Sequence, residues 1–272
     1  MNNGLYDGVD NGLHNGVLEG SLNGLSNGLF NDVKSQAYTT KSIFFNGTTT
    51  YTSQDTLLNT IKNNLGGSVT IWVYPISYPG LTTIFSFSNS VGTINTFAIQ
   101  HSRVLLNSGG STQWIINYPK ALPLNTWSHL VITHDGITPI VYLNGIKLVG
   151  QVFANSNNKT KWLASIVTPN NCITGAHAYS SVILEYFNGF INSVAYYNRM
   201  LQAEEVWQLY NTGNWIDIRK FNSYLNCKAW YRYGDNTLTK SGANFITTNY
   251  TTASTNSTTA NIVSTDIVNF IP

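Results

Sequence analysis

From about residue 40 onward, the chain consists of short runs of β-branched and aromatic residues separated by Gly, Asn, Ser and Pro. Such runs are typical of β-strands joined by turns. In VTIWVYP (69–75), the apolar residues Val69, Ile71 and Val73 fall on alternate positions and therefore on one face of a strand. About a dozen strands are expected between residues 40 and 200. The other clear runs are SIFFN (42–46), TIFSFS (83–88), TFAIQ (96–100), RVLLN (103–107), SHLVITHD (128–135) and PIVYLNGIKLVG (139–150).

Two local patterns refine this picture. Asn144-Gly145 lies between two apolar runs and predicts a β-hairpin with a type I′ turn. Helical periodicity is convincing only in LQAEEVWQLYN (201–211), where Leu201, Val206, Leu209 and Tyr210 can share one face. Many strands with one short helix predict an all-β fold of two packed antiparallel sheets.

The first residues follow a different rule, because glycine recurs at every fourth position from 4 to 28. A four-residue repeat turns an α-helix by about 40° per unit, and each interior glycine costs roughly 1 kcal/mol, so a free helix is unfavourable. Collagen needs glycine at every third residue. The segment is either a disordered leader or an arm that its own domain, sister copies or a larger assembly holds in place. The apolar residues of this expected assembly arm (residues 2–33) are Leu5, Val9, Leu13, Val17, Leu25 and Leu29.

Composition limits the partners. The chain is 42% hydrophobic, only 10% charged and has a net charge of +2, with 14 dispersed Lys and Arg residues. No basic cluster indicates nucleic-acid binding. No apolar stretch reaches the length of a membrane span, and no signal peptide is apparent, so neither is expected. The two cysteines, Cys172 and Cys227, could pair or both be free.

Three stretches together resemble a known superfamily. GSVTIWVYPISYPGLTTIFSFSN, NTWSHLVITHDGITPIVYLNGIKLVG and FNGFINSVAYYNRMLQAEEVWQLYN are similar, in order and spacing, to the concanavalin A-like superfamily, specifically its laminin G-like or pentraxin-like branch. The resemblance covers about residues 40–212 and implies a jelly-roll sandwich in which Trp72 and Trp127 are buried. It also implies a serine at position 202, where this chain has Gln202, so the helix lacks the expected N-cap.

The tail carries a second resemblance. LNCKAWYRYGDNTLTKSGANF followed by TTANIVSTDIVNFIP is similar to a C-terminal extension of virion proteins from marine bacteriophages and large DNA viruses, which also tend to have Asn-Gly-Leu repeats before a laminin G-like domain. The chain is therefore expected to have three parts. These are an assembly arm over 1–36, the jelly roll over 37–215, and an irregular C-terminal extension over 216–272 that packs on the domain or on neighbours.

The sequence gives little support for catalysis. A glycosidase needs two carboxylates at defined separation, and between residues 40 and 200 the only acids are Asp55, Asp135 and Glu185. Asp135-Gly136 predicts a turn between strands. Glu204 and Glu205 lie in the first turn of the predicted helix, where negative charge complements the helix dipole. We therefore expect that the protein is not an enzyme.

Histidines make no stronger case for a metal or a catalytic group. His129 and His134 stand at i and i+5 of one strand, hence on opposite faces. His101 and His177 have no acidic or cysteine neighbour at ligand spacing.

The resemblance points to two kinds of ligand, Ca²⁺ and sugars. Many members of the resembled branch bind sugars or partners through Ca²⁺, which takes several oxygen ligands. Asp135 and Asp55 are the candidate ligands here, and no other cofactor is expected. Exposed aromatic rings could instead form a sugar platform, although core packing is their commoner role. The glycan-binding candidates are Trp114, Tyr118, Tyr78 and Tyr179.

Three functions compete. The arm and the tail favour a virion structural component, a capsid-decorating, fibre or appendage subunit at the particle surface. It would bind other virion proteins or its own copies through residues 2–33 and display a lectin-like domain for attachment to a host glycan. The alternative is a glycan-binding adhesion module of a cellular surface protein, and a glycoside hydrolase is the remote one.

Overall fold

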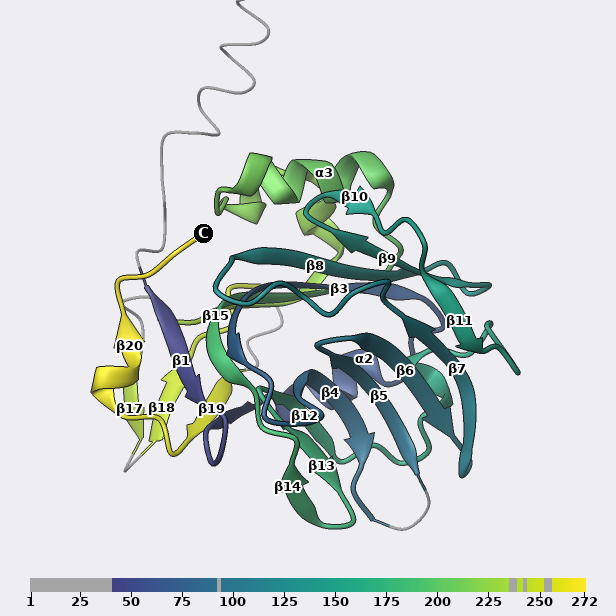
Figure 1. Ribbon diagram of the computed structural model, residues 1–272, viewed down its shortest axis with the longest axis horizontal. Helices are drawn as coiled ribbons and strands as arrows, with labels where there is room; N and C mark the ends of the chain where they lie inside the picture. Colours follow the sequence, from purple (N-terminus) through teal and green to yellow (C-terminus); the bar gives the residue numbers. More distant parts are fainter. Residues whose placement is uncertain (1–40, 92–93, 235–238, 242–243, 252–255) are drawn as a thin grey trace, which may run out of the picture. The chain divides into compact units, whose positions relative to one another are not determined.

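The computed structural model describes residues 41–91, 94–234, 239–241, 244–251 and 256–272, and the predicted assembly arm lies outside them. Two antiparallel sheets pack face to face (Figure 1). The first sheet has eight strands in the order β10 (Ile146–Lys147), β9 (Pro139–Leu143), β8 (Ser128–His134), β3 (Gly67–Ser77), β15 (Asn188–Tyr197), β1 (Ser42–Asn46) and β20 (Ile267–Val268), with β16 (Cys227–Arg232) also paired to β15.

The second sheet has ten strands. Their order is β11 (Val152–Asn155), β7 (Ser111–Asn117), β6 (Arg103–Ser108), β5 (Asn95–Gln100), β4 (Thr83–Asn89), β12 (Asn171–Thr174), β2 (Tyr51–Ser53), β19 (Ser257–Ala260), β18 (Asn244–Thr247) and β17 (Thr239–Ser241). A separate two-stranded sheet joins β13 (His177–Tyr179) to β14 (Val182–Leu184). The predicted all-β, two-sheet sandwich is therefore confirmed.

Alternation along the strands explains how the sandwich closes. Val69, Ile71 and Val73 of β3 are fully buried between the sheets, as the run 69–75 predicted. From the second sheet, Phe97 of β5 and Trp114 of β7 enter the same core. Each large apolar side chain removed from water stabilises the fold by roughly 1.5–3 kcal/mol, so these facing rows drive the pairing of the sheets.

The predicted hairpin at Asn144-Gly145 is also confirmed. Both residues have positive φ, 52° and 79°, as a type I′ turn requires. They join Leu143 of β9 directly to Ile146 of β10 in antiparallel register.

Short helical segments cover the ends and one outer face. The helix predicted over 201–211 is α3 (Ala203–Tyr210), which buries Val206 and Leu209. It lies over the outer side of the first sheet (Figure 1), where the Tyr210 ring stacks at 5.9 Å from the Trp72 ring. The other segments are η1 (Asp55–Leu57), α2 (Leu58–Ile61), η2 (Leu163–Ser165), η3 (Asn211–Gly213), η4 (Ile218–Lys220), η5 (Asn222–Asn226) and η6 (Ser264–Asp266).

The start of α3 has a substitute for the missing serine cap. The Glu205 carboxylate accepts a hydrogen bond of 2.9 Å from the backbone N–H of Gln202. Arg199 donates two hydrogen bonds, of 2.7 and 2.5 Å, to the same carboxylate and fixes it. A carboxylate in the first turn satisfies a free N–H group and complements the helix dipole.

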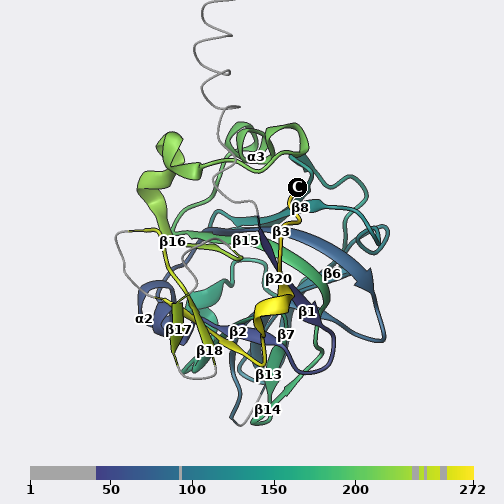
Figure 2. The ribbon, with the colours of Figure 1, turned by 90° about the vertical axis from the view of Figure 1, so that its left-hand side faces the viewer.

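Two expectations need correction. Trp72 is buried as expected, but Trp127 is only partly buried and packs against Phe270 on the outer face of the first sheet. The tail, expected to be irregular, supplies β16 and β20 to the first sheet and β17, β18 and β19 to the second. In Figure 2 its strands β17, β18 and β20 lie on the flank that also carries β1 and β2.

A buried polar network ties this tail to the sandwich. The two N–H groups of the Gln54 amide are shared among three hydroxyls around the nitrogen, those of Thr52 at 2.6 Å, of Ser257 at 3.2 Å and of Tyr233. Tyr233 follows β16 and Ser257 begins β19, so one buried amide joins three separate segments. Because buried polar groups are costly when unpaired, this network holds the tail to one arrangement.

Replacing Gln54 with alanine is expected to lower the free energy of unfolding by about 1–3 kcal/mol, because the buried hydroxyls of Thr52, Tyr233 and Ser257 lose their hydrogen bonds to the amide. Urea unfolding followed by tryptophan fluorescence measures the change. Asn63→Ala, at an exposed position, is the control and should leave stability within about 0.5 kcal/mol of the parent. Equal stability of the Gln54 variant and the control would contradict the role given to the network.

Candidate functional site

A hairpin folded over the outer face of the ten-stranded sheet builds the site. The chain leaves β12 at Gly175, whose φ of +85° carries it out of the sheet. A Cβ at this position would lie 2.3 Å from Cδ1 of Phe45, so only glycine fits. The β13–β14 hairpin that follows has its own small apolar cluster, in which Ala176 and Ala178 are buried with Ile173.

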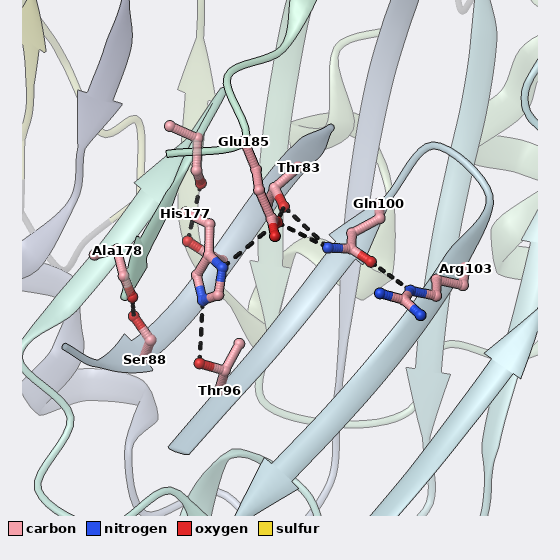
Figure 3. Close-up of polar contacts among 10 residues, drawn as sticks. Thr83, Ser88, Thr96, Gln100, Arg103, His177, Ala178 and Glu185 are labelled. Atoms are coloured by element: carbon pink, nitrogen blue, oxygen red, sulfur yellow. Dashed lines mark hydrogen bonds and ion pairs between the residues drawn. The ribbon is translucent and has the colours of Figure 1, made fainter. Parts of the chain in front are cut away.

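Two serine hydroxyls on β4 hold the hairpin down. Ser86 Oγ donates to the carbonyl oxygen of Ala176 at 3.0 Å. Ser88 Oγ donates to that of Ala178 at 3.1 Å, as Figure 3 shows. These bonds satisfy carbonyl groups that the hairpin would otherwise bury against the sheet without partners. They explain why alternate positions of β4 are serine.

The hairpin and the sheet enclose a groove of about 190 Å³. Its floor comes from the outward-facing residues of β5 and β6, whose alternate residues form the core, and its wall comes from the β13–β14 hairpin. The lining is Leu81, Ile94, Thr96, Ala98, Gln100, Arg103, Leu105, Asn107, His177, Tyr179, Leu184 and Glu185. A largely apolar hollow with a few converging polar groups is the usual form of a small-ligand site.

Glu185 lies at the centre of the polar part. Its backbone is left-handed, with φ of 57°, which is unusual for a residue with this side chain. Its Oε2 atom accepts hydrogen bonds from Thr83 Oγ1 at 2.6 Å and Gln100 Nε2 at 2.9 Å, and lies 3.5 Å from Nδ1 of His177 (Figure 3). Burial raises the pKa of Glu185, but the contacts with His177, Thr83 and Gln100 outweigh it, so the pKa lies below its ordinary value.

The neighbours of Glu185 extend the network across the floor. Nε2 of His177 lies 3.1 Å from Thr96 Oγ1, so both ring nitrogens of this histidine face polar groups of the groove. On the other side, Gln100 Oε1 accepts a hydrogen bond of 2.6 Å from Nε of Arg103. A chain of polar contacts thus runs from His177 through Glu185 and Gln100 to Arg103 (Figure 3).

Of the four predicted glycan-binding residues, the structure places one in the groove. Tyr179 is 37% exposed and lines the groove. The prediction is wrong for Trp114 and Tyr118, which are 0% and 7% exposed because both pack into the core. Tyr78 is partly buried outside the groove lining, where its hydroxyl donates to the Leu122 carbonyl oxygen at 2.8 Å and its ring stacks on His101.

The two candidate metal ligands, Asp135 and Asp55, accept hydrogen bonds from nearby backbone N–H groups. Asp135 Oδ1 accepts backbone hydrogen bonds from Ile137 and Thr138, which confirms the predicted turn. Asp55 Oδ1 accepts one from the backbone N–H of Cys172. Within the described ranges, no group of three or more His, Cys, Asp or Glu side chains is placed to hold a metal ion.

The structure also shows where the two strand histidines and the two cysteines lie. His129 and His134 lie on opposite faces as predicted, stacked on Trp72 and Trp162 respectively. Cys172 and Cys227 are both free and buried.

No helix in the described part of the chain is long and apolar enough to cross a membrane. The arm residues Leu5, Val9, Leu13, Val17, Leu25 and Leu29 lie outside the described residues.

The polar row of the groove is absent from the predictions made from the sequence. His177 has no acidic residue at metal-ligand spacing in the sequence, but the hairpin brings its ring to Glu185, eight positions away. The turn between β13 and β14 is Ser180-Ser181, with φ of 50° and 62°, where the recognisable sequence would be Asn-Gly. The usable signal was the alternation of Thr96, Ala98 and Gln100 with the core residues of β5, which marks them as one outward face.

Comparison with known proteins places this fold in a family. The family model for the concanavalin A-like lectin/glucanases superfamily matches residues 38–207 of the 272-residue chain. The chain belongs to this superfamily. None of the curated proteins matches the sequence.

Solved structures with the same fold include carbohydrate-binding proteins. The CBM40 of the Ruminococcus gnavus IT-sialidase, bound to α2,3-sialyllactose, superposes with a TM-score of 0.54 and 16% identity, over 62% of this chain and 96% of that one. A putative carbohydrate-binding protein from Bacteroides ovatus gives a TM-score of 0.52 and 15% identity, over 82% of this chain and 58% of that one. The K499G mutant of NanB sialidase from Streptococcus pneumoniae gives a TM-score of 0.51 and 19% identity, over 61% of this chain and 27% of that one. At these identities, the likeness shows the fold.

The lowered pKa of Glu185 predicts a specific acid response. Its ionised form stabilises the fold above the unfolded pKa, near the ordinary value of 4.5, and this contribution is lost as the pH falls through the folded pKa. Glu185→Gln is therefore expected to be less stable at neutral pH and to lose less further stability between about pH 5 and pH 3.

Thermal unfolding at a series of pH values measures this response. Glu204→Gln is the matched control, because it removes an exposed carboxylate on α3 outside the groove. An acid response of the Glu185 variant identical to that of the parent protein would show that this carboxylate is not held as described.

Proposed function

We propose that the protein is a carbohydrate-binding module and that the groove between β5, β6 and the β13–β14 hairpin takes the sugar. The observation that carries the proposal is the lining itself. Apolar side chains alternate there with polar groups on a single exposed hollow. Sugar rings present C–H faces and hydroxyl groups together, so they match a surface on which apolar and hydrogen-bonding groups are mixed.

The individual residues have distinct roles in this proposal. The partly exposed ring of Tyr179 offers a flat apolar surface at the edge of the groove. Arg103 and Glu185 present hydrogen-bonding groups whose positions are fixed by the Gln100 amide between them. A preorganised site loses less conformational entropy when a ligand binds. The fold family and its carbohydrate-binding structural neighbours support the same assignment.

Binding, rather than hydrolysis, is the proposed activity. Most glycoside hydrolases use two carboxyl groups about 5–9.5 Å apart. Within the described lining, Glu185 is the one carboxylate. The groove therefore supplies recognition groups without the second acid that the two-carboxylate mechanism needs.

We further propose that this module is displayed on a virus particle, as a capsid-decorating, fibre or appendage subunit at the outer surface. The support is the tetrapeptide repeat of residues 2–33 and the similarity of the tail to extensions of virion proteins. A glycine-rich segment with regularly spaced apolar residues has too little side-chain area to form its own core. In this proposal it docks to other virion proteins or to copies of itself, and the sugar is a host-surface glycan.

Glycan-array binding of the full chain is expected, and Tyr179→Ala is expected to weaken it by roughly tenfold through loss of ring contact. Trp207→Ala is the matched control, because Trp207 is an exposed aromatic residue, 47% accessible, on α3. Retained binding by the Tyr179 variant, with loss in the Trp207 variant, would move the site to the other sheet. No binding to any glycan would contradict the proposed function.

Deleting residues 1–36 is expected to leave a folded domain that no longer enters particles or oligomers, as measured by analytical ultracentrifugation and particle incorporation. A second variant replaces Leu5, Val9, Leu13, Val17, Leu25 and Leu29 with serine and keeps the chain length. It should show the same defect, because burial of the apolar side chains provides the driving force. Normal assembly of both variants would exclude a docking role for the arm.

A further inference from the structure

Two opposite charges face the groove without pairing to each other. Gln100 lies between them and uses both ends of its amide: Oε1 accepts from Nε of Arg103 at 2.6 Å, and Nε2 donates to Oε2 of Glu185 at 2.9 Å (Figure 3). The ion pairs formed among the described residues do not include one between Arg103 and Glu185. The neutral amide thus holds a cation and an anion apart on one surface.

Arg103 has most of its donors unused. A guanidinium carries five N–H groups, and the hydrogen bond to Gln100 takes the one on Nε. Neither terminal nitrogen donates to another described residue. Its outer edge therefore offers parallel N–H groups, the geometry that binds a carboxylate through two hydrogen bonds.

Glu185 is also only half engaged. The contacts from Thr83, Gln100 and His177 all converge on Oε2. No described residue donates a hydrogen bond to Oε1, which remains able to accept one from a ligand hydroxyl. The groove therefore presents a forked cationic donor and an anionic acceptor, separated by the length of one glutamine amide.

We propose that the groove selects acidic sugars: Arg103 binds the carboxylate of the sugar through its terminal nitrogens, and Glu185 Oε1 accepts a hydrogen bond from a hydroxyl of the same residue. Gln100 is the positioning residue that fixes the Arg103 side chain. The apolar part of the lining, including Leu105 and Leu184, contacts the C–H face of the ring. This inference rests on the proposed carbohydrate-binding function and names its ligand class.

The physical reason for selectivity is the cost of leaving Arg103 without an anion. A neutral sugar would displace water from the partly buried guanidinium without supplying a charge, whereas a carboxylate forms charge-assisted hydrogen bonds. The neighbouring Glu185 carboxylate repels an anion placed on its side of the groove, so the acid group must lie at the Arg103 end. Orientation of the bound sugar follows from these two charges together.

Isothermal titration of the full chain with two matched ligand sets tests the inference. The first set is lactose, 3′-sulfolactose and 3′-sialyllactose, and the second is trigalacturonate with its methyl ester, which removes the charge and keeps the rings. The carboxylate ligands are expected to bind roughly tenfold or more tightly than their neutral counterparts. Arg103→Gln is expected to abolish that difference, and Arg103→Lys, which keeps the charge but loses the fork, to reduce it.

Lys147→Gln is the control for net charge, because it removes an exposed cation on β10 outside the groove and should leave the preference unchanged. Thermal unfolding shows that each variant is folded. Equal binding of charged and neutral ligands, insensitive to Arg103, would overturn the acidic-sugar inference while leaving carbohydrate binding in place. Tighter binding of 3′-sulfolactose than of 3′-sialyllactose would overturn the carboxylate assignment, and binding of no sugar would overturn both proposals.

Discussion

Two hydrogen bonds from serine hydroxyls on β4 hold the β13–β14 hairpin in place and so create the groove proposed as the binding site. Without Ser86 and Ser88, the carbonyl groups of Ala176 and Ala178 would face a sheet surface that offers them no donor. The turn of the hairpin and the residue after β14 have positive φ, at Ser180, Ser181 and Glu185, and such conformations are costly for residues other than glycine. Such strain persists only where surrounding contacts fix it, and it is concentrated at functional sites.

The position of the hairpin decides which residues become a site. The outward faces of β5 and β6 would be an ordinary sheet surface if nothing covered them. The hairpin adds a wall and delivers His177 and Glu185 to Thr96 and Gln100. The result is a fixed row of polar groups beside apolar side chains, in which the two charged residues are kept apart. A rigid scaffold that carries its recognition groups on a covering segment can vary its ligand without changing its core.

The sequence could predict the scaffold because its signals are local. Alternation in the run 69–75 marked the core face of β3, and Asn144-Gly145 marked a hairpin, since only such residues favour the type I′ turn. The site depends on contacts that are distant along the chain: Thr83 and Gln100 meet Glu185 from positions far earlier in the chain. The Ser180-Ser181 turn carries no recognisable turn signal. Aromatic character alone also could not distinguish the buried Trp114 from the exposed Tyr179, because the core needs large rings as much as a binding surface does.

A crystal structure of the protein soaked with an acidic oligosaccharide tests the central claim most directly. The account predicts sugar density between β5, β6 and the β13–β14 hairpin, with the carboxylate beside the Arg103 guanidinium. Density on the outer face of the eight-stranded sheet, near Trp127 and Phe270, with the groove left empty, would contradict it.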